Sequence, residues 1–210
     1  MRFDPIIGTE MPRTNGKMTT EVTRSVRKEA IHAAARTLFC KRGFAETSMQ
    51  DIASELGLQR GSLYHHIESK EELLLEILAD SQNEMFGAVE RIINGKSSAP
   101  EKLCLYLMVS LETMARRQQE MLIWIAEFRK IPEVLEPLAK KAHKVDANLM
   151  RIIEEGIETG TWSPKDKHLA FQTIRGVIAW FPHWYKPSGR LSVSEISQEM
   201  NRWAISMLAG

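Results

Sequence analysis

The chain has 210 residues, of which 43% are hydrophobic and 26% are charged, as in an ordinary soluble globular protein. A formal net charge of +1 excludes a strongly basic or acidic protein, and the length allows one large domain or a small domain followed by a medium one. The two cysteines, Cys40 and Cys104, lie far apart without a C-x-x-C pair, which argues against a disulfide framework and a zinc site.

Basic residues gather in the N-terminal third. Between Pro12 and His66 there are nine lysine or arginine residues and five aspartate or glutamate residues, while the rest of the chain is slightly acidic. This distribution is the electrostatic footprint expected of a module that contacts phosphate groups. Residues 1–20 mix Pro, Gly, Thr and Asn without periodicity, and we expect them to form a disordered N-terminal arm.

Helical periodicity then sets in. Apolar residues spaced as on one face of a helix predict a first helix over residues 21–41, which Gly43 ends. Thr47 or Ser48 can cap a second, short helix, because either hydroxyl can accept from a backbone N–H of the first turn. A third helix is predicted over residues 59–66.

The rest of the chain has the same periodicity. Further helices are predicted at residues 69–94, 100–114, 118–130, 132–159 and 166–185, and from Ser192 or Ser194 to the end. β-branched residues never alternate with polar ones long enough to predict a strand. The chain is therefore expected to be all-α with about nine helices, divided between an N-terminal domain over residues 21–68 and a helical domain over residues 69–210.

The stretch from Thr47 to Leu73 carries the functional signal. It predicts two short helices joined by a tight turn at Gly57 and followed at once by the start of a longer helix. A short helix held on a small rigid support is what places side chains in the DNA major groove. The pattern therefore indicates a helix-turn-helix DNA reader.

This stretch resembles the TetR family of transcriptional regulators from about Val26 to Leu78. The matching residues are Gly43-Phe44, Thr47-Ser48-Met49, Asp51-Ile52-Ala53, Gly57, Gly61, Leu63-Tyr64, His66 and Ser69-Lys70. Ile67 stands where the family more usually has Phe. The resemblance implies an all-α homodimer that binds double-stranded operator DNA and holds a small effector in its C-terminal domain.

Nine residues of the motif are candidate DNA contacts. The candidate base readers are Gln59, Arg60, Ser62 and His65. The candidate phosphate contacts are Thr47, Ser48, Tyr64 and Lys70. Arg60 suits guanine and Gln59 suits adenine, and Gly61 allows a close approach to DNA or to the supporting helix. Taken singly, the same residues also fit structural roles, such as a core tyrosine, a helix cap or a solvated lysine.

The family resemblance also implies dimerisation through the last two helices. Two subunits are needed because paired recognition helices enter successive major grooves about 34–36 Å apart. The interface candidates are Phe171, Ile174, Ile178, Trp203 and Ile205. The alternative is that these side chains belong to the core of one subunit.

Large and adaptable side chains between Trp124 and Tyr185 predict an apolar pocket. The candidate ligand residues are Trp124, Phe128, Arg129, Met150, Arg175, Trp180 and Trp184. The alternative is that the tryptophan-rich run is core. Arg175 lies in an otherwise apolar helix, where an unpaired charge is costly, so it either pairs with an acid such as Glu127 or binds the ligand.

The run from Arg175 to Gly189 is similar to TetR regulators of fatty-acid, steroid and aromatic-acid catabolism that sense acyl-CoA thioesters. Such an effector has a greasy tail for the pocket and a phosphate-rich head for nearby basic residues. We therefore expect a repressor that releases its operator when an acyl-CoA binds. The sequence does not decide between repression and activation, which depends on where the operator lies.

Other functions are weakly indicated. No Ser/His/Asp set, metal-ligand spacing or phosphate loop is present, so neither an enzyme, a metal site nor a cofactor is expected. No uninterrupted apolar run of eighteen residues and no apolar leader occur, so we expect a cytoplasmic protein without a membrane partner. Three alternatives remain: a helical ligand-binding or protein-interaction module without DNA binding, a regulator with a non-CoA hydrophobic effector, and a regulator switched by a partner protein.

Overall fold

The computed structural model describes the backbone of residues 16–210 and the side chains of residues 27–210. These described residues form nine α-helices and no strand, as expected. The helices are α1 (Gly16–Arg42), α2 (Met49–Glu55), α3 (Arg60–Tyr64), α4 (Lys70–Ile93), α5 (Ala99–Arg116), α6 (Gln118–Glu127), α7 (Pro132–Glu158), α8 (Lys167–Trp184) and α9 (Val193–Ala209).

Two expected boundaries need correction. The N-terminal arm was expected over residues 1–20, but α1 already begins at Gly16, and residues 1–15 lie outside the described part. Helix α6 ends at Glu127 rather than at Lys130. The physical reason for the second correction is Pro132, because the residue before a proline avoids the α region, and Ile131 has φ −132° and ψ 56°.

Local side-chain chemistry sets where most helices begin. Ser48, Ser98 and Ser192 each form a capping box with an acid three residues on, and the Ser69 side chain accepts from the backbone N–H of Glu72. The Asp166 carboxylate caps α8 by accepting two backbone N–H groups. These caps satisfy N–H groups that have no partner inside the helix.

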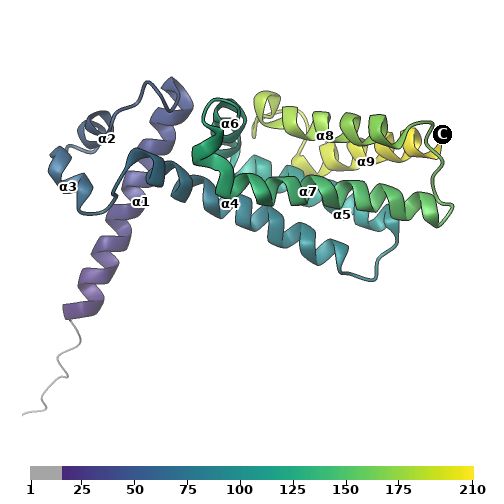
Figure 1. The fold of residues 1–210 in the computed structure, drawn as a ribbon, viewed down its shortest axis with the longest axis horizontal. Helices are drawn as coiled ribbons and strands as arrows, with labels where there is room; N and C mark the ends of the chain where they lie inside the picture. The colour runs from purple at the N-terminus through teal and green to yellow at the C-terminus, as the bar shows by residue number, and fades with distance from the viewer. Residues whose placement is uncertain (1–15) are drawn as a thin grey trace, which may run out of the picture.

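Figure 1 shows α1, α2 and α3 gathered at one end of an elongated molecule, with the long helices α5, α7, α8 and α9 forming a bundle at the other. Helix α4 leaves the first group and runs along the bundle, where it packs mainly against α7. Helix α6 lies at the junction and contacts α1, α4 and α8. The two ends are thus joined by α4 and α6.

The hydrophobic core falls into two clusters that meet within α4. Leu73, Leu74, Ile77 and Leu78 belong to a cluster with α1, α2 and α3, whereas Met85, Val89 and Ile93 belong to a cluster with α5, α7, α8 and α9. Residues from α6 and the start of α7 also pack on the first cluster. The N-terminal core therefore continues past the expected domain boundary at residue 68, because α4 is part of both units.

Candidate DNA-reading surface and effector cavity

Helix α3 is held by one buried side chain and presents the others to solvent. Leu63 is fully buried in the N-terminal core, and Gly57 makes the turn before α3 with φ +64°, a conformation that favours glycine. Gln59, Arg60, Tyr64 and His65 are exposed, and Ser62 is half-buried. The residues expected to read bases therefore lie on or beside one short, anchored helix.

Arg60 and Tyr64 contact each other on this surface. The Arg60 guanidinium donates to the Tyr64 hydroxyl at 3.1 Å and lies 5.5 Å from the centre of the ring. A Cβ atom added to Gly61 between them would have no described heavy atom within 4 Å. The small size of Gly61 is therefore not required by packing within the described part of the protein.

Two of the expected phosphate contacts have other roles in the structure. Thr47 is only 1% exposed and its hydroxyl donates to the carbonyl of Gly43, so Ser48, which is exposed, is the residue that caps α2. The Lys70 ammonium donates to the carbonyls of Phe44 and Thr47 at 2.9 Å each, and to that of Ala45 at 3.5 Å.

Lys70 therefore stabilises the turn between α1 and α2. Its Nζ also lies 4.3 Å from the centre of the Phe44 ring, which adds a cation–π contact. An ammonium has three N–H donors, and all three have backbone acceptors here. Sequence reasoning missed this role because the acceptors are carbonyls more than twenty residues away in the chain.

Two buried acids of α6 hold the N-terminal unit. Glu120 accepts from Arg36 of α1 at 2.7 Å, and Glu127 accepts from the backbone N–H of Phe44 at 3.4 Å. Both carboxylates are almost fully buried, and each has a further partner nearby, Arg117 for Glu120 and Lys130 for Glu127. Their seven-residue spacing places them on one face of α6, which is the face toward α1.

An adjoining face of α6 forms one wall of a cavity of about 490 Å³. Helices α4, α5, α7 and α8 supply the other walls. The lining is mostly apolar and includes Met85, Met114, Met121, Trp124, Ile125, Phe128, Val145, Ile178 and Ala179. Trp124 and Phe128, whose ring centroids are 4.9 Å apart, also pack against the N-terminal core, so the cavity wall and that core share side chains.

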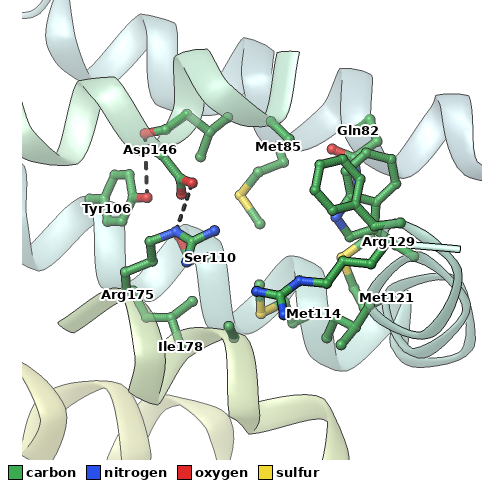
Figure 2. Close-up of a pocket in the computed structure, with 16 residues that line it drawn as sticks. Gln82, Met85, Tyr106, Ser110, Met114, Met121, Arg129, Asp146, Arg175 and Ile178 are labelled. Carbon is green, nitrogen blue, oxygen red and sulfur yellow. Dashed lines mark hydrogen bonds and ion pairs between the residues drawn. The ribbon is translucent and has the colours of Figure 1, made fainter. Parts of the chain in front are cut away.

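One end of the cavity is polar (Figure 2). There Arg175 donates through Nε to Asp146 at 2.7 Å, and the Tyr106 hydroxyl donates to the carbonyl of Val145 at 3.5 Å. Burial strongly raises the pKa of Tyr106, and the Asp146 carboxylate raises it further while Arg175 opposes the shift. Tyr106 therefore stays neutral and can donate a hydrogen bond at any ordinary pH.

The structure separates the expected ligand residues into two groups. Trp124, Phe128, Arg129 and Arg175 line the cavity, whereas Met150, Trp180 and Trp184 do not. Trp180 is 62% exposed and stacks on His183, because it lies on the face of α8 that points away from the cavity. Arg175 pairs with an acid, as one of the two alternatives had it, but this acid is Asp146 and not Glu127, which faces α1.

Sequence reasoning missed four polar residues of the cavity lining, Gln82, Tyr106, Ser110 and Asp146. A signal for Gln82 was present, because it stands four residues after Leu78 and three before Met85 and so interrupts the apolar stripe of α4. Tyr106 and Asp146 carry no comparable signal, since which of their faces borders a cavity depends on how the helices pack.

The expected interface residues are also divided. Ile174 and Ile178 are buried within their own subunit's core, and Phe171 and Ile205 are half-buried against it. Trp203 is 63% exposed. The exposed large hydrophobic residues of α8 and α9 are Leu169, Val177, Trp180, Trp184 and Trp203. Packing explains the division, because the buried isoleucines lie on the face of α8 opposite to its exposed large hydrophobic residues.

Within the described residues, no group of three or more His, Cys, Asp or Glu side chains could hold a metal ion. No helix of the described part is long and apolar enough to cross a membrane. The features that remain, an exposed reading helix and a cavity joined by two shared helices, define a helix-turn-helix DNA-binding protein with a second, cavity-bearing unit.

Comparison with known proteins agrees with this class. Residues 31–77 match the model for bacterial regulatory proteins of the tetR family, and residues 96–208 match a tetracyclin repressor-like C-terminal domain. The chain is 31% identical over 179 residues to the HTH-type transcriptional repressor KstR2 of Mycolicibacterium smegmatis, covering 82% of this chain and 86% of that protein. The corresponding repressor of Rhodococcus jostii is 29% identical, covering 84% and 88%.

A solved structure, that of the ketosteroid transcriptional regulator KstR2 of Mycobacterium tuberculosis, has a TM-score of 0.80 at 25% identity, covering 86% of this chain and 93% of that one. The chain therefore belongs to the TetR family of bacterial regulatory proteins. It is a DNA-binding transcriptional regulator, which confirms the family resemblance and the expectation that it is not an enzyme.

Proposed function

We propose that this protein is a repressor that binds its operator as a homodimer and leaves it when an acyl-CoA thioester enters the cavity. The observation that carries this proposal is the shared role of α6. Met121, Trp124 and Ile125 line the cavity, while Glu120 on the same helix is paired with Arg36 of the DNA-binding unit. An effector that displaces this wall also disturbs the support of the reading helix.

The proposed DNA contacts follow from exposure. Gln59, Arg60, Ser62 and His65 read base edges, and Gly61 allows the close approach. Ser48 and Tyr64 contact phosphates, with the N-terminus of α2 favouring negative charge. Thr47 and Lys70 support these contacts from within by holding the turn before α2. On binding DNA, the Arg60 guanidinium gives up its hydrogen bond to Tyr64 and donates two hydrogen bonds to guanine, which the planar guanidinium group matches in geometry.

The proposed dimer forms through the exposed faces of α8 and α9. A shallow apolar groove of about 150 Å³ runs between these helices, with Val177, Met200 and Trp203 among its lining residues. Large exposed apolar side chains on adjacent helices are costly in water and typical of a subunit interface. Phe171 and Ile205 flank this surface, and Ile174 and Ile178 support it from the core.

The effector assignment rests on volume and chemistry. A cavity of about 490 Å³ with apolar walls accommodates a ring-containing acyl group. Among the described residues, the Arg175 guanidinium donates a hydrogen bond through Nε alone, so its terminal N–H groups are available to a thioester carbonyl or a phosphate. Because one relative is described as a ketosteroid regulator, we propose an acyl group with fused or alicyclic rings.

Release of DNA by the effector is a linkage between two sites. To weaken operator binding about 1000-fold, the effector must prefer the DNA-free form by about 4 kcal/mol. We propose that helix α4 transmits effector binding to the DNA-binding unit, because it carries residues of both cores and lines the cavity.

The test is fluorescence anisotropy of the purified protein on DNA from upstream of its own coding region, titrated with a panel of acyl-CoA thioesters and matching free acids. Release by one thioester but not by its acid is the expected result. Tight and salt-sensitive binding that no thioester disturbs would retain the DNA reader and reject the CoA effector. Arg60→Ala is expected to lose the preference for operator over unrelated DNA.

A further inference from the structure

One polar side chain of the cavity has no partner in the protein. Gln82, in the middle of α4, is 7% exposed and lines the cavity. It makes no side-chain hydrogen bond with any described residue. Its amide offers two donors and one acceptor oxygen, none of which pairs with a described residue, so these groups are open to a molecule in the cavity.

The sequence around Gln82 makes its polarity conspicuous. Its neighbours on the same face of α4 are Leu78 and Met85, both buried in the core. A leucine or methionine at position 82 would continue this apolar stripe without leaving an amide unpaired. The amide therefore has a use that the free protein does not supply, and a molecule in the cavity is the partner within its reach.

The cavity thus has two polar ends. In Figure 2 the Tyr106, Asp146 and Arg175 group lies on the left, Gln82 lies on the right, and Met85 stands between them. The left end holds an ion pair, whereas Gln82 is uncharged. The Arg175 end suits a charged or strongly polar group, and the Gln82 amide suits a neutral oxygen, while Arg129, labelled on the same side as Gln82, adds a positive charge to the lining.

We propose that Gln82 recognises a ketone or hydroxyl group on the ring portion of the effector, remote from the thioester. This assignment rests on the proposed function and narrows the effector class to ring systems that carry a neutral oxygen substituent. The amide can donate to a ketone, or both donate to and accept from a hydroxyl, so either group satisfies it.

The position of Gln82 gives this contact a second consequence. It lies between Leu78, which belongs to the N-terminal core, and Met85, which belongs to the core of the effector unit. The adjacent Ser81 hydroxyl donates to the carbonyl of Leu78, a contact that tends to bend helices. A hydrogen bond to Gln82 therefore acts on α4 where it passes from one unit to the other, and it contributes to release as well as to affinity.

The experiment compares two thioesters that differ in one oxygen, the CoA esters of 3-oxoandrost-4-ene-17β-carboxylic acid and of androst-4-ene-17β-carboxylic acid. Calorimetry measures their affinities, and anisotropy measures operator release. The wild-type protein is expected to bind the ketone at least about tenfold more tightly. Gln82→Met is expected to bind both thioesters equally, and Gln119→Met, at an exposed glutamine of α6, to behave as wild type. An unchanged preference for the ketone in Gln82→Met would overturn the proposal.

A measurement without ligand tests the role of Gln82 independently of the identity of the effector. Urea unfolding of Gln82→Met is expected to have an unchanged or higher midpoint than wild type, because an unpaired amide is removed. A lower midpoint would mean that Gln82 has a partner inside the protein, which overturns the proposal. If neither thioester binds the wild-type protein, the acyl-CoA assignment fails. The unfolding midpoint of Gln82→Met then tests by itself whether the Gln82 amide lacks a partner inside the protein.

Discussion

The Arg36 guanidinium of α1 donates to the Glu120 carboxylate of α6 across 2.7 Å, and this pair joins the DNA-binding unit to the wall of the effector cavity. Glu120 is only 3% exposed, and its carboxylate has a second ion-pair partner in Arg117 at 3.6 Å. The next residue, Met121, lines the cavity. A movement of the turn of α6 that carries Glu120 and Met121 therefore changes both the support of the DNA-binding unit and the wall of the cavity.

Replacing Arg36 with methionine is expected to lower the free energy of unfolding by about 2 kcal/mol, because a buried carboxylate loses its shortest ion pair. Urea denaturation measures this change. The matched control is Arg116→Met, whose partner Glu84 lies in a more exposed pair, and about 0.5 kcal/mol is expected there. Equal effects of the two substitutions would show that the Arg36–Glu120 pair stabilises the fold no more than an exposed ion pair does.

Lys70→Met is expected to weaken operator binding about tenfold without changing its salt dependence, because Lys70 holds the turn before α2 and does not replace counterions on DNA. A residue that contacts a phosphate would instead reduce the salt slope by about one. Anisotropy titrations at several salt concentrations measure both quantities. Lys41→Met, at an exposed lysine near the end of α1, serves as the control for loss of one positive charge.

Arg175→Met is expected to raise the effector concentration needed for operator release by at least about tenfold, while leaving DNA binding without effector unchanged. The substitution removes the charged donor at one end of the cavity and leaves the reading helix untouched. Arg151→Met is the matched control, since Arg151 is an exposed arginine of α7 outside the cavity. Loss of effector response in both variants would point to general destabilisation.

Trp203→Lys is expected to convert the dimer into a monomer that binds operator DNA weakly. In the proposed dimer, a lysine at this position of the apolar interface would bury an unpaired ammonium, which is strongly unfavourable. Sedimentation velocity measures the oligomeric state. Ala126→Lys, at an exposed position of α6, adds the same charge away from the interface, and its variant should remain dimeric.

Acid should remove the contribution of the helix cap at Glu195. Hydrogen bonds from the Ser192 hydroxyl and backbone N–H hold the pKa of Glu195 below its usual value, against the opposing effect of desolvation. A lowered pKa stabilises the folded state above the unfolded-state pKa of about 4.3, and this stability is lost as pH falls through the folded value. Glu195→Gln should therefore be less stable than wild type at pH 6, with the difference shrinking as the pH falls below about 4.3.

Local features of the chain were sufficient to predict the helices. Ser48, Ser69 and Ser192 begin helices as expected, because a cap is decided by residues within one turn. The turn at Gly57 was likewise predictable from one residue that tolerates positive φ. The family pattern from Gly43 to Lys70 depends on such local spacing, and for this reason the reading helix could be located before the fold was known.

The sequence by itself determined an all-α regulator with a helix-turn-helix, since periodicity, caps and a fixed motif are properties of neighbouring residues. Tertiary packing alone decided that Asp146 pairs with Arg175, that Lys70 binds carbonyls of a distant turn, and that Trp180 faces outward while Gln82 faces a cavity. The reason is geometric. Which face of a helix meets another helix depends on crossing angles and on the volumes of side chains from several helices at once, and no local window of sequence contains that information.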